Sequence, residues 1–67
     1  MKVRILWNSK NIKFKPPFNG EYIDFERVPN RFETFTCAYV TYEVKRVNTE
    51  IIGWKFFYTI YVDYYKG

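Results

Sequence analysis

The chain has 67 residues and a mass of 8.3 kDa, which allows a single domain over residues 1–67. The net charge is +4, and the sequence contains no histidine and one cysteine, Cys37. This composition excludes a histidine-activated nucleophile, an intramolecular disulfide and a cysteine-based metal cage. We expect Cys37 to be a small buried residue of a strand.

The first predicted element is a strand over Lys2–Trp7, where Val3, Ile5 and Trp7 alternate with charged side chains. A period of two is typical of a strand with one buried face. The apolar run in this segment is well short of the roughly 7–15 residues of a signal-peptide core. The most apolar window, Ile51–Val62, is too short for the roughly 20 residues of a membrane helix, so we expect no membrane partner.

The dipeptide Asn19-Gly20 predicts a hairpin with a two-residue loop, because glycine adopts the positive φ that tight hairpin turns need. The register opposes Lys15 to Asp24, Lys13 to Glu26 and Phe14 to Phe25. Pro16 would then occupy a hydrogen-bonded position without an N–H group, so we expect a distorted or wider loop there. The segment Val28–Phe35 is compatible with a short helical turn near Arg31 or with a loop.

Phe35–Val47 and Ile51–Tyr65 are predicted to be the two long strands. Their even-numbered residues are mostly apolar and form the expected core face: Ala38, Val40, Tyr42 and Val44 on the first strand, and Ile52, Trp54, Phe56, Tyr58, Ile60, Val62 and Tyr64 on the second. Even positions oppose each other only if the connecting loop has an odd number of residues. We therefore predict a three-residue loop at Asn48-Thr49.

The odd-numbered positions of these strands form a second face that is also aromatic. A sheet with one solvated face normally alternates between apolar and polar residues, and this one does not. Two explanations stay open: the Lys2–Trp7 strand and the Ile12–Phe25 hairpin cover this face, or a partner covers part of it. The residues expected to contact a partner are Phe35, Tyr39, Lys45, Lys55, Phe57, Tyr61 and Tyr65.

Catalytic chemistry finds no support in the residues. Glu21, Asp24 and Glu26 are expected to be solvated partners of lysines, and Ser9 has no histidine to activate it. Three scattered glycines cannot form a phosphate-binding loop, and no cluster resembles a metal site. We therefore expect no enzymatic activity, no catalytic residue, no metal and no cofactor.

The predicted fold is all-β, with four to five antiparallel strands in a meander or partly closed barrel. The expected function is a protein–protein interaction module, acting on an acidic partner or on a second copy as a homodimer. A small phage-type inhibitor of a host or defence protein fits this description. The abundance of residues with AT-rich codons indicates a low-GC bacterium or its phage, and the single cysteine fits a cytoplasmic location. The alternative function is single-stranded nucleic-acid binding by the same aromatics and the N-terminal lysines.

Overall fold

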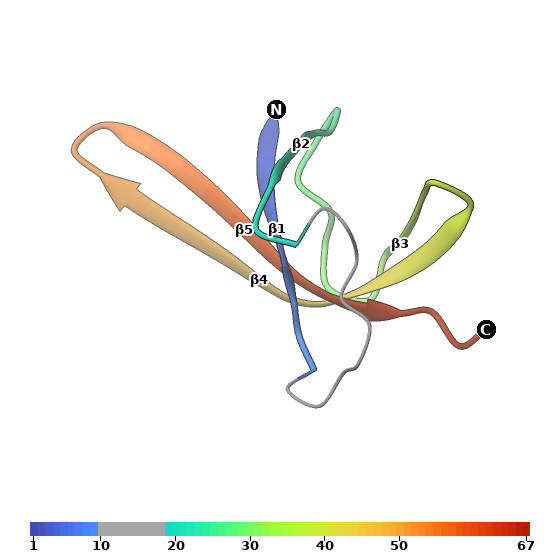
Figure 1. Cartoon of the computed structure of the whole chain (residues 1–67). Helices are drawn as coiled ribbons and strands as arrows, with labels where there is room; N and C mark the ends of the chain where they lie inside the picture. Colours follow the sequence, from blue (N-terminus) through green and yellow to red (C-terminus); the bar gives the residue numbers. More distant parts are fainter. Residues whose placement is uncertain (10–18) are drawn as a thin grey trace.

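The computed structural model describes residues 1–9 and 19–67. These residues form five strands: β1 (Lys2–Trp7), β2 (Tyr22–Asp24), β3 (Thr34–Cys37), β4 (Val40–Ile52) and β5 (Lys55–Tyr64). The strands make one sheet in the order β2-β1-β5-β4-β3, which curls into a half-barrel (Figure 1). Within the described residues there is no helix, and therefore no helix that could cross a membrane. The predicted small all-β fold is confirmed.

The sheet is mixed, because β1 runs antiparallel to β2 but parallel to β5. The parallel pairing differs from the antiparallel meander that we expected. It joins the first and last strands of the chain, so β1 has a neighbour on each edge. The predicted strand bounds of Lys2–Trp7 are confirmed, and Val3 and Ile5 are completely buried.

The core lies on one side of the sheet, which we call the inner face. Its buried residues are Val3, Ile5, Tyr42, Val44, Ile60 and Val62. The strand register places Ile5 opposite Ile60 and Val44 opposite Val62. Each buried aliphatic side chain of this kind stabilises the fold by about 1.5–3 kcal/mol. The loop after β2 also contributes, because Phe25 and Val28 pack against the cluster.

A row of five aromatic rings crosses the inner face. The centroid distances are 5.4 Å for Phe25–Phe35, 5.5 Å for Phe35–Tyr42, 5.5 Å for Tyr42–Tyr64 and 4.8 Å for Tyr64–Trp7. Pairs in these stacked and edge-on geometries add about 0.5–1.5 kcal/mol beyond their buried area. Burial, with the nearby Tyr64, raises the pKa of Tyr42. Of the aromatic residues expected on the second face, this row includes only Phe35, which contacts Phe25.

The β4–β5 pairing places even beside even only between Tyr42–Val44 and Val62–Tyr64, and a β-bulge produces this match. From Arg46 to the turn, even positions oppose odd positions, contrary to the expectation. Val44 lies opposite Val62, and the next cross-strand pair is Arg46 with Tyr61, so Lys45 is an extra residue in a β-bulge. The strands are joined at Gly53-Trp54, where Gly53 has a φ of 62°. The predicted three-residue loop at Asn48-Thr49 is wrong. The bulge changes the parity of the pairing, so a two-residue turn suffices.

A second tight turn interrupts the predicted strand Phe35–Val47. Ala38 and Tyr39 have φ values of 50° and 68°, and they connect β3 to β4. Positive φ at both central residues defines the type I′ hairpin turn, which normally contains Asn and Gly. Ala and Tyr are strained in this conformation, and their sequence carried no turn signal. Cys37 ends β3 and is partly buried against the core.

The strand after Asn19-Gly20 lies beside the N-terminal strand of the sheet. It is β2, which pairs with β1 and places Asp24 opposite Lys2. The Asp24 carboxylate also accepts a hydrogen bond from the Met1 ammonium group, which holds the pKa of Asp24 below its ordinary value. The predicted register of Asp24, Phe25 and Glu26 with Lys15, Phe14 and Lys13, and the distortion at Pro16, involve positions 13–16, which lie outside the described residues.

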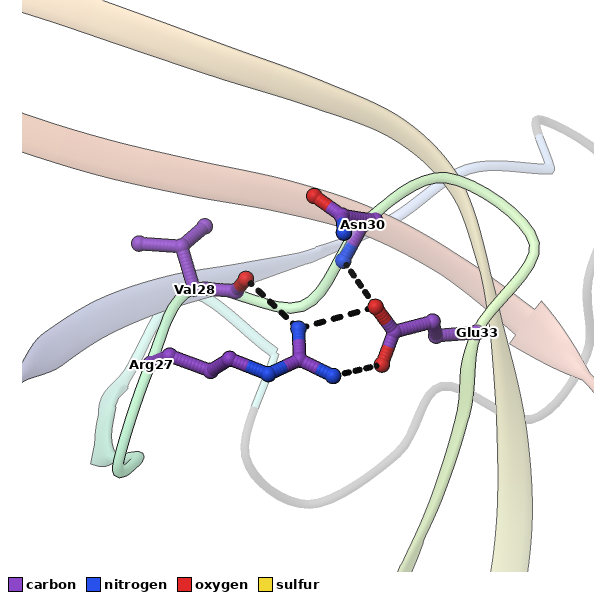
Figure 2. Close-up of polar contacts among 4 residues, drawn as sticks. All are labelled: Arg27, Val28, Asn30 and Glu33. Atoms are coloured by element: carbon purple, nitrogen blue, oxygen red, sulfur yellow. Dashed lines mark hydrogen bonds and ion pairs between the residues drawn. The ribbon is translucent and has the colours of Figure 1, made fainter.

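Between β2 and β3 the chain forms a loop, not a helical turn. The Glu33 N–H donates to the Asn30 carbonyl at 3.1 Å, and Phe32 within this turn has a φ of 73°. Figure 2 shows the Arg27 guanidinium donating to both Glu33 carboxylate oxygens, at 2.8 and 2.7 Å. The Asn30 N–H donates to the same carboxylate at 3.2 Å. These contacts fix a turn that holds the Phe32 ring in solvent.

Candidate functional site

Residues 48–57 are all exposed and form the distal end of the β4–β5 hairpin, which we call the arm. In Figure 1 the arm projects to the upper left, away from the other strands. The molecule accordingly measures 36 Å along its longest axis and 23 and 18 Å along the others. Strand β1 pairs with β5 only from Tyr58 onward, and β3 pairs with β4 only as far as Glu43. Within the described residues, the arm therefore consists of its own two strands alone.

The arm exposes large apolar side chains on both of its faces. The exposed fractions are 62% for Ile51, 59% for Ile52, 97% for Trp54 and 58% for Phe56. Ile51 lies opposite Phe56 on the inner face, whereas Ile52 lies opposite Lys55 on the other side, which we call the outer face. The prediction that Ile52, Trp54 and Phe56 belong to the core is therefore wrong. The body of the sheet is too small to extend beneath the arm.

Two of the residues expected to contact a partner, Phe57 and Tyr61, share the outer face of β5. Lys55 lies beside the Gly53-Trp54 turn and is exposed. Lys45 is the bulge residue, and its ammonium group pairs with Glu43 at 2.5 Å. Tyr65 follows β5 and is about half exposed.

The other two expected contact residues lie elsewhere. Phe35 is on the inner face, stacked against Tyr42, because the two-residue turn opposes it to an even-numbered residue. It belongs to the aromatic row of the core. Tyr39 is fully exposed in the β3–β4 turn. The predicted set therefore does not form one continuous face.

The outer face combines aromatic rings with charges of both signs. Arg4 lies opposite Tyr22, and the Arg46 guanidinium lies 4.0 Å from the centroid of the Tyr61 ring. Two carboxylates oppose each other on the same side, Glu43 on β4 and Asp63 on β5. The local positive charge is therefore partly neutralised.

A hollow of about 450 Å³ lies near the Asn30–Glu33 turn. It opens beside the edge of β4 that points away from β5, which we call the outer edge of β4. It is lined by Asn30, Arg31, Lys45, Arg46 and Val47. Two of its cations already lie over aromatic rings, since Arg31 is 4.7 Å from the Phe32 ring centroid and Arg46 covers Tyr61. The hollow is thus basic and is bordered by aromatic groups, which suits a further aromatic side chain.

Among residues 1–9 and 19–67, no group of three or more His, Cys, Asp or Glu side chains is placed to hold a metal ion. Comparison of the chain with protein-family models, curated proteins and solved structures finds no match.

Sequence reasoning missed the arm as a surface, although one signal was present. Gly53 occupies the first central position of a two-residue turn, with a negative φ at Trp54, as expected for type II′. Placing the turn there leaves Trp54 at the tip, where no core position is available. The apolar alternation over Ile51–Tyr65 was a stronger signal than the turn preference of Gly53, and it favoured a buried Trp54.

Proposed function

We propose that the protein is a non-enzymatic protein-interaction module that binds its partner through the arm. The observation that supports this function is the exposure of Ile51, Ile52, Trp54 and Phe56 on a hairpin that no other strand of the described residues adjoins. Contiguous exposed apolar surface commonly marks interaction sites, and tryptophan is enriched among the residues that dominate binding energy. Burial of such apolar surface favours association, and the surplus over the entropic and desolvation costs of binding appears as affinity.

The charge of the arm favours a protein over a nucleic acid as its ligand. Glu50 and Lys55 are its only charged residues, so its formal charges cancel. Nucleic-acid affinity depends on an excess of cations that neutralise phosphates. Aliphatic side chains such as Ile51 and Ile52 gain from burial in an apolar protein groove and offer no planar surface for base stacking. A small phage-encoded inhibitor that occupies a surface of a host or defence protein would use an arm in this way.

The outer face offers a second candidate function, single-stranded nucleic-acid binding. Arg4 beside Tyr22 and Arg46 over Tyr61 combine stacking surfaces with positive charge. The opposed carboxylates of Glu43 and Asp63 weaken this candidate, because they repel phosphates from the same face.

Affinity capture from a cell lysate, with identification by mass spectrometry, tests the arm. The bait proteins are the wild type, a double variant Ile52→Ser/Trp54→Ser, and the control Tyr39→Ser, which alters an equally exposed ring in the other hairpin. We expect the wild type and the control to retain the same protein and the double variant to lose it. Circular dichroism checks that all three are folded. Retention by the double variant would contradict the proposal.

A salt titration of binding to a labelled single-stranded oligonucleotide separates the second candidate. Phosphate contacts give a steep fall in log affinity with log salt concentration. If the outer face binds nucleic acid, Arg4→Ala and Tyr61→Ser weaken binding, whereas the arm variant does not. Absence of binding at low salt removes this candidate.

A further inference from the structure

The longest unpaired stretch of strand in the described structure is the outer edge of β4. Strand β3 covers this edge as far as Glu43, and the Val44 N–H and carbonyl are paired with the Glu33 carbonyl and the Phe32 N–H at 2.9 and 2.8 Å. Beyond the bulge at Lys45, no described residue pairs with the outer edge, which leaves Arg46–Ile52 open. An exposed edge of this length is a template for pairing with another strand.

We propose that this open edge pairs with the same edge of a second copy of the chain, in an antiparallel, two-fold symmetric dimer. The inference rests on the proposed protein-binding function and names the partner as a second copy. An isologous contact requires a surface that is complementary to itself. The edge meets this requirement in its backbone groups, its side chains and its length.

The backbone groups on the open edge belong to alternate residues. A two-residue turn is closed by a hydrogen-bonded pair, here Ile52 with Lys55, and hydrogen-bonded and non-hydrogen-bonded pairs then alternate along the hairpin. The residues whose N–H and carbonyl groups point away from β5 are therefore Val47, Thr49 and Ile51. These groups are the ones that a second strand would engage.

The length of the open edge fixes the register. The midpoint of Arg46–Ile52 is Thr49, so full use of the edge places Thr49 opposite Thr49 of the second copy. Val47 then lies opposite Ile51 of the second copy, and every outward backbone group meets an outward backbone group. Thr–Thr and β-branched cross-strand pairs are favourable in antiparallel sheets. Arg46 lies diagonally from Glu50 of the second copy, which adds charge complementarity.

The ends of the edge also match. In this register Trp54 of one copy arrives beside Val44 of the other, where the Asn30–Glu33 turn already occupies the edge. The basic hollow lies at this position and includes Arg31 and Arg46. A tryptophan ring is the best acceptor for such cations. The dimer therefore gives the exposed Trp54 a binding place that the single chain lacks.

Sedimentation or light scattering measures the assembly directly. We expect the wild type to have twice the 8.3 kDa mass of one chain. Ile51→Lys should raise the dimer dissociation constant at least tenfold, because it places a cation on the pairing edge. The matched control is Phe56→Lys, which lies directly across the arm with nearly the same exposure but on β5. Loss of the dimer in the control alone would overturn edge pairing in favour of face-to-face packing.

Cysteine scanning tests the register without relying on destabilised variants. In a Cys37→Ser background, residues 47 to 51 are replaced by cysteine one at a time, with Tyr39→Cys as the exposed control. We expect the fastest intermolecular disulfide at Thr49→Cys, because a directly opposed pair has the Cα separation that a disulfide needs. A maximum at Asn48→Cys, or no position faster than the control, would overturn the proposed pairing.

The mass of the wild type and the capture experiment together distinguish the dimer from the protein-binding function. If the wild type stays at the mass of one chain while the Ile52→Ser/Trp54→Ser variant loses a captured protein, the dimer is wrong and the protein-binding function stands. If the dimer forms and crosslinks at Thr49→Cys, the inference is supported even where no other protein is captured.

Discussion

The Arg46 guanidinium lies 4.0 Å over the Tyr61 ring, and the same two residues form the first cross-strand pair beyond the bulge at Lys45. The contact joins β4 to β5 at the point where the pairing register changes. A bulge bends and twists the strand that contains it. This pair therefore lies where the direction of the arm is set.

We predict that Arg46→Ala destabilises the fold by about 0.5–1 kcal/mol, the value of an exposed cation–π contact. The change is measured by urea unfolding at one fixed chain concentration. Arg4→Ala is the matched control, because Arg4 is also exposed on the outer face but lies over no ring of residues 1–9 or 19–67. It should change the unfolding free energy by less than about 0.5 kcal/mol. Equal effects of the two substitutions would show that the Tyr61 contact contributes nothing.

The sequence predicted the cross-strand pairing of β4 with β5 correctly before the bulge and incorrectly after it. Even-numbered positions were correctly matched near Val44 and Val62, because apolar alternation is a reliable guide to the buried face. The bulge was not predicted, because the residues that face the core change along β4. They are even-numbered before Lys45 and odd-numbered from Val47 onward. Two adjacent charges, Lys45-Arg46, are the visible sign of this change.

Deletion of Lys45 should therefore leave the cross-strand neighbours unchanged. Without the extra residue, Val44 and Arg46 oppose Val62 and Tyr61 in a regular ladder, and only the bend of the strand is lost. Cross-strand proton contacts between Arg46 and Tyr61, measured by NMR, should persist. The lost Lys45–Glu43 ion pair costs little, because surface ion pairs contribute about 0–1 kcal/mol.

Deletion of Asn48 is the control for this experiment. A deletion at this position cannot keep both the Arg46–Tyr61 pair and the Thr49–Tyr58 pair in register, because it shortens β4 between them. The proton contacts of one of these two pairs should therefore disappear. A variant lacking Lys45 that also loses its native cross-strand contacts would contradict the assignment of Lys45 as the inserted residue.

The β3–β4 turn could not be predicted, because Ala and Tyr disfavour the backbone conformation that they adopt in it. Ala38 and Tyr39 both have positive φ, which costs non-glycine residues of order 1–3 kcal/mol each. The cooperative pairing of Phe35 with Tyr42 and of Cys37 with Val40 imposes this geometry. Local sequence preference was therefore overridden by contacts that a linear pattern does not contain.

Replacing this turn by Asn-Gly should stabilise the protein. Ala38→Asn/Tyr39→Gly supplies residues that favour type I′ geometry, and the fully exposed Tyr39 ring has no packing to lose. We expect a gain of about 1–2 kcal/mol, and each kcal/mol raises the melting temperature by about 4–8 °C in a domain of this size. A Gly53→Ala/Trp54→Ala variant serves as the opposite case, because it removes the glycine that the arm turn requires and should destabilise the hairpin.

The Arg27–Glu33 pair predicts a specific acid sensitivity of the loop before β3. The hydrogen bonds from Arg27 and from the Asn30 N–H hold the pKa of Glu33 below its ordinary value of 4.5. As the pH falls, the Glu33 carboxylate is therefore protonated at a higher pH in the unfolded chain than in the folded chain. The stabilisation from the ionised carboxylate is complete above pH 4.5 and is lost as the pH falls through the lower folded-state pKa.

Glu33→Gln tests this directly, because glutamine keeps the size but not the charge of the side chain. The wild type should be more stable than the variant at neutral pH, and the two should converge in acid below the folded-state pKa of Glu33. Urea unfolding at both pH values measures the difference. Glu26→Gln, on the same loop but without an ion pair to any described residue, is the control and should not reproduce the change with pH. A gap between wild type and Glu33→Gln that stays constant into acid would mean that the Arg27 contact does not depend on the carboxylate charge.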